Sequence, residues 1–226
     1  MEPANIIIRF FQEGGPFMYP IAVALVVGLS IMLERWLFLS SAKRSNRKEF
    51  EELLPLLRKK DFKKVMKQSA SSKSPISRVV SAAVTRLAVT PRRDEIEFAM
   101  EEGVMEAVPR LEKRTQYLAT LANIATLLGL LGTIIGLIAA FTAVASADPT
   151  EKASLLSQSI SVAMNTTAFG LMSAIPLLLG HSILQTKTME IVDSLEMAGL
   201  KCLNMITGSS NTAASAGTRR SDREQA

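Results

Sequence analysis

Three long intervals of this chain contain almost no charged side chains, and they limit the possible folds more than any other feature. No Asp, Glu, Lys or Arg occurs in residues 14–33 or 115–147, and Lys187 is the only one in residues 153–189. A helix needs roughly 20 mostly apolar residues to cross a hydrocarbon core of about 30 Å. None of the three intervals has the polar face that a soluble helix of this length would show. We therefore predict an all-α membrane protein with three transmembrane helices and long helical cytoplasmic extensions.

Basic residues determine the predicted orientation, because short cytoplasmic flanks of spanning helices are enriched in Lys and Arg. Arg9 is the only basic residue before the first interval, whereas residues 43–60 contain seven. The connection between the second and third intervals contains one, Lys152. We predict a multi-pass protein of the bacterial inner membrane with its N-terminus outside and its C-terminus inside.

The same patterns divide the chain into segments. The predicted segments are an outer interfacial helix at 1–16, the first span at 17–39, a cytoplasmic helical domain at 40–115, the second span at 116–146, a short periplasmic loop at 147–153, the third span at 154–186, a cytoplasmic helical extension at 187–206 and a disordered tail at 207–226. Within the cytoplasmic domain, Thr90 and Pro91 predict the N-cap and first position of a helix. We expect that helix to run unbroken into the second span.

Composition argues against several classes of function. With one His and one Cys, the chain offers no set of ligands for a metal and no nucleophile paired with a base, so we predict neither an enzyme nor a bound cofactor. The formal charge is +5, but residues 43–114 carry 18 basic and 11 acidic residues without interleaved aromatics. That mixture predicts a solvated domain and no nucleic-acid partner.

Small residues and threonines form a stripe on the second predicted span. Five residues lie within about 40° of one direction on a helix of 3.6 residues per turn: Thr126, Gly129, Thr133, Leu137 and Ala140. Gly132 and Gly136 add a GxxxG-type spacing, which favours close helix packing in lipid. From the residues alone, the stripe fits either a packing seam or the lining of a polar path.

The third predicted span has its own polar side. Thr167, Ala174 and His181 fall along one face, flanked by Ala163 and Gly170. Uncharged hydroxyls can coordinate water or an ion without the cost of a buried charge, which is about 2.5–3.5 kcal/mol at the bilayer centre. Ordinary hydrogen bonds between helices are the alternative explanation.

Two motifs in these spans carry a resemblance to a known family. The string Gly129-Leu-Leu-Gly132-Thr133-Ile-Ile-Gly136, followed after a loop by the string from Ala168 to Pro176, resembles the paired signature of the ExbB/TolQ/MotA proton-channel family. The likeness covers about residues 14–205, including a Glu-Arg pair that closes the first span. It implies the channel-forming subunit of an ion-driven inner-membrane motor.

The resemblance also implies partners and site residues. It implies a homo-oligomer, a ring of five subunits, around a single-span ExbD/TolR/MotB-like partner whose membrane aspartate carries H⁺ or Na⁺. Thr133 and Thr167 match the family's pore-lining threonines, so we assign them to the ion pathway. The other residues assigned to helix packing or pore lining are Thr126, Gly129, Gly132, Gly136, Ala140, Ala163, Gly170, Ala174 and Pro176.

Some features of the chain lie outside this pattern. ExbB and TolQ carry a glutamate in the third span at the position where this chain has Val162. That departure favours an ion path that relies on the partner's aspartate, or a specialised motor. We assign possible subunit contacts to Glu34, Arg35, Asn165 and Thr166. The alternative function is a structural membrane scaffold without ion conduction.

Overall fold

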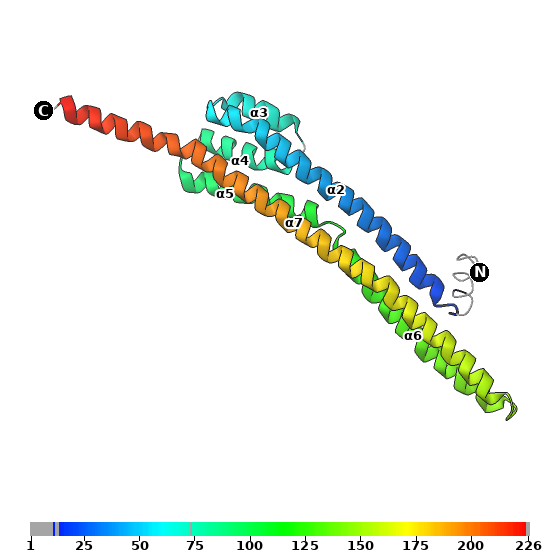
Figure 1. Cartoon of the computed structure of the whole chain (residues 1–226). Helices are drawn as coiled ribbons and strands as arrows, with labels where there is room; N and C mark the ends of the chain where they lie inside the picture. The colour runs from blue at the N-terminus through cyan, green and yellow to red at the C-terminus, as the bar shows by residue number, and fades with distance from the viewer. Residues whose placement is uncertain (1–10, 12–13, 73, 225–226) are drawn as a thin grey trace. The chain divides into compact units, whose positions relative to one another are not determined.

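Every regular element in the described part of the chain is a helix (Figure 1). The computed structural model describes residue 11, residues 14–72 and residues 74–224, with side chains described as far as Thr207. The helices are α2 (Met18–Arg58), α3 (Phe62–Ser71), α4 (Pro75–Val89), α5 (Arg93–Glu112), α6 (Gln116–Ser146) and α7 (Lys152–Glu224). The all-α prediction is confirmed for these residues. Three helical stretches, within Met18–Arg58, Arg93–Ser146 and Lys152–Thr207, are long and apolar enough to cross a membrane, as predicted.

The chain divides into two compact units, and α2 and α7 contribute to both. The membrane unit comprises residues 1–36 and 114–185, and the polar unit comprises residues 37–113 and 186–226. Large apolar side chains point outward from the membrane unit. Leu127, Phe141 and Met172 are each more than 60% exposed. Such exposure would be costly in water and is compatible with a lipid surrounding.

Packing in the membrane unit brings α6 against α7 and α2 against α7. A Cβ atom added to Gly28 would meet the side chain of Leu177, and one added to Gly180 would meet Met32. Between these two contacts the residue numbers increase on both helices, so α2 and α7 run parallel. Helix α6 runs antiparallel to α7, because successive contacts on α6 meet earlier residues of α7.

The polar unit has a core like that of a soluble helical domain. Helix α4 packs against both α3 and α5 (Figure 1). The fully buried side chains include Leu53, Leu57, Val65, Ile76, Val79, Ile96, Ile191 and Leu195. Burial of one such side chain stabilises a fold by about 1.5–3 kcal/mol. Asp61 and Ser74 cap α3 and α4, since their side chains accept hydrogen bonds from the backbone N–H groups of Lys64 and Ser77.

Two details of the predicted cytoplasmic helices are wrong. Thr90 is the C-cap of α4, where its N–H donates to the carbonyl of Arg86 at 2.8 Å, and α5 begins at Arg93. The proline after Thr90 disfavours helical dihedrals there, and Thr90 is extended accordingly. The helix also does not run unbroken into the second span. It stops at Glu112, and Arg114 takes a left-handed φ of 67° before α6 begins.

The predictions for the two ends of the chain can be compared with the structure to different extents. Most of the predicted interfacial helix at 1–16 lies outside the described residues. At the other end, α7 continues to Glu224 through the segment predicted to be disordered. Extending a helix costs much less than starting one, because each added residue gains a backbone hydrogen bond without a new nucleus. Polar composition alone therefore did not reveal this continuation.

Candidate functional site

The small residues of α6 and α7 form a close helix-packing seam within the chain. A Cβ atom added to Gly170 would lie 2.7 Å from the carbonyl oxygen of Ala125, and one added to Gly136 would lie 2.9 Å from Cβ of Ala163. Between these points, Gly129 lies against the backbone of Thr167 and Gly170. Small residues at the contact allow the backbones to approach this closely, and such packing contributes to helix association in lipid.

The remaining residues assigned to helix packing or pore lining are mostly buried. Gly132 packs against Thr166, since an added Cβ atom would meet the Thr166 methyl group. Ala140, Ala163 and Ala174 are buried, whereas Pro176 is half-buried inside α7.

Three threonines of α6 and α7 donate their hydroxyl hydrogens to backbone carbonyls. The Oγ1 of Thr167 donates to the carbonyl of Gly129 across the helix pair at 2.8 Å. The Oγ1 of Thr133 donates to Leu130 at 2.6 Å, and that of Thr126 donates to Ala122 at 3.1 Å. Each side chain is partly exposed in the single chain. A hydroxyl has one hydrogen, so each group retains only acceptor lone pairs for another molecule.

Thr166 and Asn165, assigned as possible subunit contacts, lie differently. The hydroxyl of Thr166 is buried and within 2.5 Å of the carbonyl of Gly14 and 3.0 Å of the carbonyl of Val162. It therefore attaches the segment before α2 to α7. Asn165 is partly exposed.

Aromatic rings reinforce the attachment of the N-terminal segment. Phe11 and Phe169 meet edge to face with ring centroids 5.1 Å apart, and Phe11 also lies 6.5 Å from Tyr19. Aromatic pairs of this geometry contribute about 0.5–1.5 kcal/mol beyond their buried area. This contact was not predicted. The only feature of the sequence that pointed to it is that the apolar Phe11 precedes the break at Gly14-Gly15-Pro16.

Glu34 and Arg35 occupy different environments near the inner end of the predicted first span. Glu34 lies 3.6 Å from the guanidinium of Arg114, and both side chains are about half exposed. Arg35 is 3% exposed. Glu34 thus has an ion-pair partner within its own chain, on the short connection that precedes α6.

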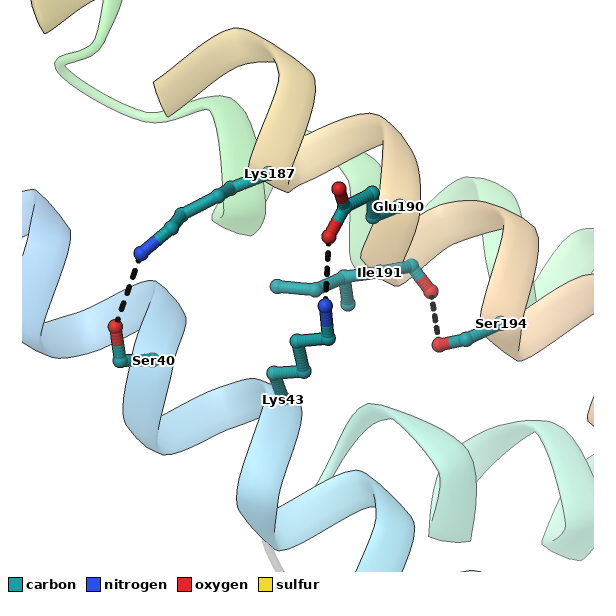
Figure 2. Close-up of polar contacts among 6 residues, drawn as sticks. All are labelled: Ser40, Lys43, Lys187, Glu190, Ile191 and Ser194. Atoms are coloured by element: carbon teal, nitrogen blue, oxygen red, sulfur yellow. Dashed lines mark hydrogen bonds and ion pairs between the residues drawn. The ribbon is translucent and has the colours of Figure 1, made fainter. Parts of the chain in front are cut away.

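A polar cluster that sequence reasoning missed links α2 and α7 in the polar unit (Figure 2). The ammonium of Lys43 lies 2.6 Å from a carboxylate oxygen of Glu190, and Lys187 donates to the hydroxyl of Ser40 at 3.4 Å. The hydrogen bond from Lys43 lowers the pKa of Glu190, with a smaller effect from the charge of Lys187. The only feature of the sequence that pointed to this cluster is the equal spacing of three residues between 40 and 43 and between 187 and 190.

Residues of the kind that bind metals do not gather in the described part of the chain. No group of three His, Cys, Asp or Glu side chains there could hold a metal ion. Cys202 is fully buried, and burial raises the pKa of its thiol to about 12.

Comparisons with known proteins give a consistent set of similarities. Residues 71–197 match the MotA/TolQ/ExbB proton channel family. The chain is 28% identical to a putative biopolymer transport protein ExbB homolog of Methanothermobacter thermautotrophicus, over 84% of this chain and 67% of that protein. It is 26% identical to a putative biopolymer transport protein ExbB-like 3 of Synechocystis, over 77% of this chain and 83% of that protein. A 67-residue stretch is 42% identical to biopolymer transport protein exbB1 of Vibrio cholerae, covering 30% of this chain and 29% of that protein.

Proposed function

This chain belongs to the MotA/TolQ/ExbB proton channel family, and we propose that it is the channel-forming subunit of an ion-driven motor. In this proposal, proton flow is coupled to rotation or movement of a single-span ExbD/TolR/MotB-like partner that acts on the cell envelope. The family match and the three apolar helices place the chain among multi-pass inner-membrane proteins. The proposed assembly is a homo-oligomer, a pentamer, around the partner's helix.

The observation that carries the proposal is the hydrogen bonding of two threonine hydroxyls. Thr133 and Thr167 both donate to carbonyls of their own chain, so each offers only lone pairs outward. An acceptor of this kind suits a protonated carboxyl group, a hydronium ion or a sodium ion. It offers no hydrogen to an ionised carboxylate. The pair would therefore favour the protonated state of the partner's aspartate over its charged state.

The membrane unit itself supplies no carboxylate within its predicted second and third spans. Residues 116–146 and 154–186 contain no Asp or Glu. Where ExbB and TolQ have a glutamate, the side chain of Val162 lies 3.3 Å from the position a Cβ of Gly15 would take. The titrating group of the proposed cycle is therefore the partner's aspartate, and this chain provides acceptors and an apolar surround.

The energy available from the ion is sufficient for such a cycle. Moving one elementary charge through 100 mV is worth about 2.3 kcal/mol. Because about 1.4 kcal/mol corresponds to a factor of ten, one ion can bias a two-state helix arrangement roughly fifty-fold. A tightly packed seam has discrete arrangements, which a bias of this size can select between.

A scaffold without ion conduction is the second candidate, and one observation favours it. The glycines of the two family motifs face each other within one chain, so their small size is explained by packing alone. This candidate assigns no role to the partly exposed threonines. It predicts no ion movement under any driving force.

Reconstitution with the partner separates the two candidates. We expect liposomes holding the complex to take up protons under an imposed potential. The double variant Thr133→Val and Thr167→Val should assemble normally and lose uptake. Thr142→Val is the matched control, because Thr142 also donates to a carbonyl of its own helix, that of Ile138, at 2.9 Å. Unchanged uptake in the double variant would exclude these threonines from the path, and no uptake by the unmodified complex would favour the scaffold.

A further inference from the structure

An apolar groove with an acidic rim lies between α5 and α7 in the polar unit. Its volume is about 400 Å³, and Val79, Met100 and Leu203 are among the residues that line its floor. Gly199 lets the helices approach closely here, since an added Cβ would lie 3.1 Å from the Met100 methyl carbon. Three carboxylates stand on its rim: Glu97, Glu101 and Glu196. We call this surface the acidic groove.

The rim carboxylates lack the ion pairs that two other carboxylates of α5 form. Elsewhere on α5, Glu95 pairs with Arg86 at 3.0 Å and Glu106 pairs with Arg78 at 3.0 Å. Within the described residues, none of the three rim carboxylates takes part in an ion pair. Apolar surface and unpaired negative charge therefore coincide at this groove.

A surface of opposite charge lies where α2 ends and α3 begins. Five exposed cations form it, and we call it the basic corner: Arg58, Lys59, Lys60, Lys63 and Lys67. The neighbouring Lys64 already has a partner, since it lies 2.8 Å from Asp61. Among the described residues, the five cations of the corner form no ion pair.

The two surfaces lie on different sides of the polar unit. Helix α4 packs against α3 on one side and against α5 on the other (Figure 1). The basic corner belongs to the α3 side and the acidic groove to the α5 side. Because α4 lies between them, the acidic groove and the basic corner of one chain do not contact each other. The surfaces of two copies can do so, and a contact between two different surfaces of identical subunits is the kind that generates a ring.

We propose that in the oligomer the acidic groove of one copy receives the basic corner of the next. Lysine suits this groove in particular, because its aliphatic stem can cover an apolar floor while its ammonium group stays at a polar rim. The contact is head to tail, and each copy uses both surfaces once. The inference rests on the proposed oligomer and is independent of ion conduction.

Cysteine cross-linking in the full-length complex tests the contact directly. In a Cys202→Ala background, a variant carrying both Glu101→Cys and Lys63→Cys should give a ladder of covalent oligomers with a short bis-maleimide. Either cysteine alone should give none. The matched control replaces the corner cysteine with Lys48→Cys, because Lys48 lies on α2 outside the corner and its side chain is 82% exposed. A ladder with Lys48 equal to that with Lys63, or no ladder with Lys63, would overturn the proposal.

Charge exchange supplies a second measurement. Glu97→Lys with Glu101→Lys should reduce the oligomer recovered at low salt, and adding Lys59→Glu with Lys63→Glu should restore it. Helix content measured by circular dichroism checks that each variant folds. If a charge variant does not fold, the cross-linking result alone decides the proposal.

The basic corner could instead bind anionic lipid head groups. Binding to phosphatidylglycerol vesicles that depends on the corner, in a protein that forms no ladder, would replace our proposal with that one. Proton uptake by a complex without the ladder would show that the contact is wrong while the proposed function stands. A protein with neither oligomer nor uptake would contradict both.

Discussion

The hydroxyl of Thr167 on α7 donates a hydrogen bond to the carbonyl of Gly129 on α6, at 2.8 Å. The bond joins the two helices that carry the family motifs, near the close approach of Gly129 and Gly170. Because this bond uses the hydrogen of the hydroxyl, only the oxygen lone pairs can bind another group. One side chain therefore contributes both to helix packing and to the proposed ion path.

Substitutions at Thr167 should separate these two contributions. Thr167→Val removes the hydroxyl and keeps the shape. We expect a stability loss of only about 0.6–1.7 kcal/mol, the range for hydrogen bonds between membrane helices. Proton uptake should nevertheless be lost, while Thr167→Ser should retain both properties. Thermal unfolding in detergent and liposome uptake measure the two effects. A Val variant that is stable and still conducts would remove Thr167 from the path.

Gly170 should tolerate no side chain. A Cβ there would lie 2.7 Å from the carbonyl oxygen of Ala125 and 3.1 Å from Cα of Gly129, both backbone atoms. We expect Gly170→Ala to push α6 from α7 and to destabilise the fold by about 1–3 kcal/mol, as for other overpacked sites. Gly180→Ala is the matched control, because its Cβ would meet the flexible side chain of Met32. Equal losses of thermal stability in the two variants would refute this explanation.

The sequence was most informative where the deciding physics is local. Long runs without charge predict spans directly, because a bilayer excludes charged side chains whatever the tertiary fold. A packing seam was one of the two interpretations that the stripe containing Gly129 allowed. Its pairing with Gly170 was not predicted. Whether Thr133 and Thr167 line an ion path stays a prediction.

Contacts between distant segments were not accessible in the same way. Lys43 and Glu190 are 147 positions apart, and neither residue signals the other in a single sequence. The interruption between α5 and α6 was missed because Arg114 adopts a left-handed φ with no glycine to mark it. The acidic groove depends on α5 and α7 meeting, which the separate helix patterns do not determine.

Acid should weaken the link between α2 and α7 that Glu190 provides. The hydrogen bond from Lys43 lowers the pKa of Glu190 in the folded state. A carboxyl group with a lowered pKa contributes stability that is full above its unfolded-state pKa and lost as pH falls through its folded-state pKa. We therefore expect the protein to unfold at a higher temperature than Glu190→Gln at neutral pH.

That difference should shrink to nothing in strong acid. Thermal midpoints measured across a pH series provide the test, and Lys43→Met should reproduce the behaviour of Glu190→Gln. A difference that stays constant with pH would mean that the ion pair contributes nothing through its charge. Both side chains are more than half exposed, so high salt should also reduce the effect.

Lys60 occupies a backbone position that normally favours glycine. The carbonyl of Leu56 accepts from the N–H of Asp61 and that of Leu57 accepts from the N–H of Lys60, which together form a Schellman motif at the end of α2. Lys60 has a φ of 55° there. The left-handed conformation costs an L-residue roughly 1–2 kcal/mol, and glycine's greater freedom when unfolded offsets about 0.5–1 kcal/mol of that.

Lys60→Gly should therefore raise the free energy of unfolding by about 0.5–1 kcal/mol. Lys60→Ala should not, because alanine keeps the strain while losing the charge. Unfolding of the two variants in detergent measures the difference, and equal stability would contradict the backbone explanation. If the basic corner binds a neighbouring copy, both variants should also recover less oligomer at low salt. A charged residue at a strained position would then be explained by the contact that its ammonium group makes.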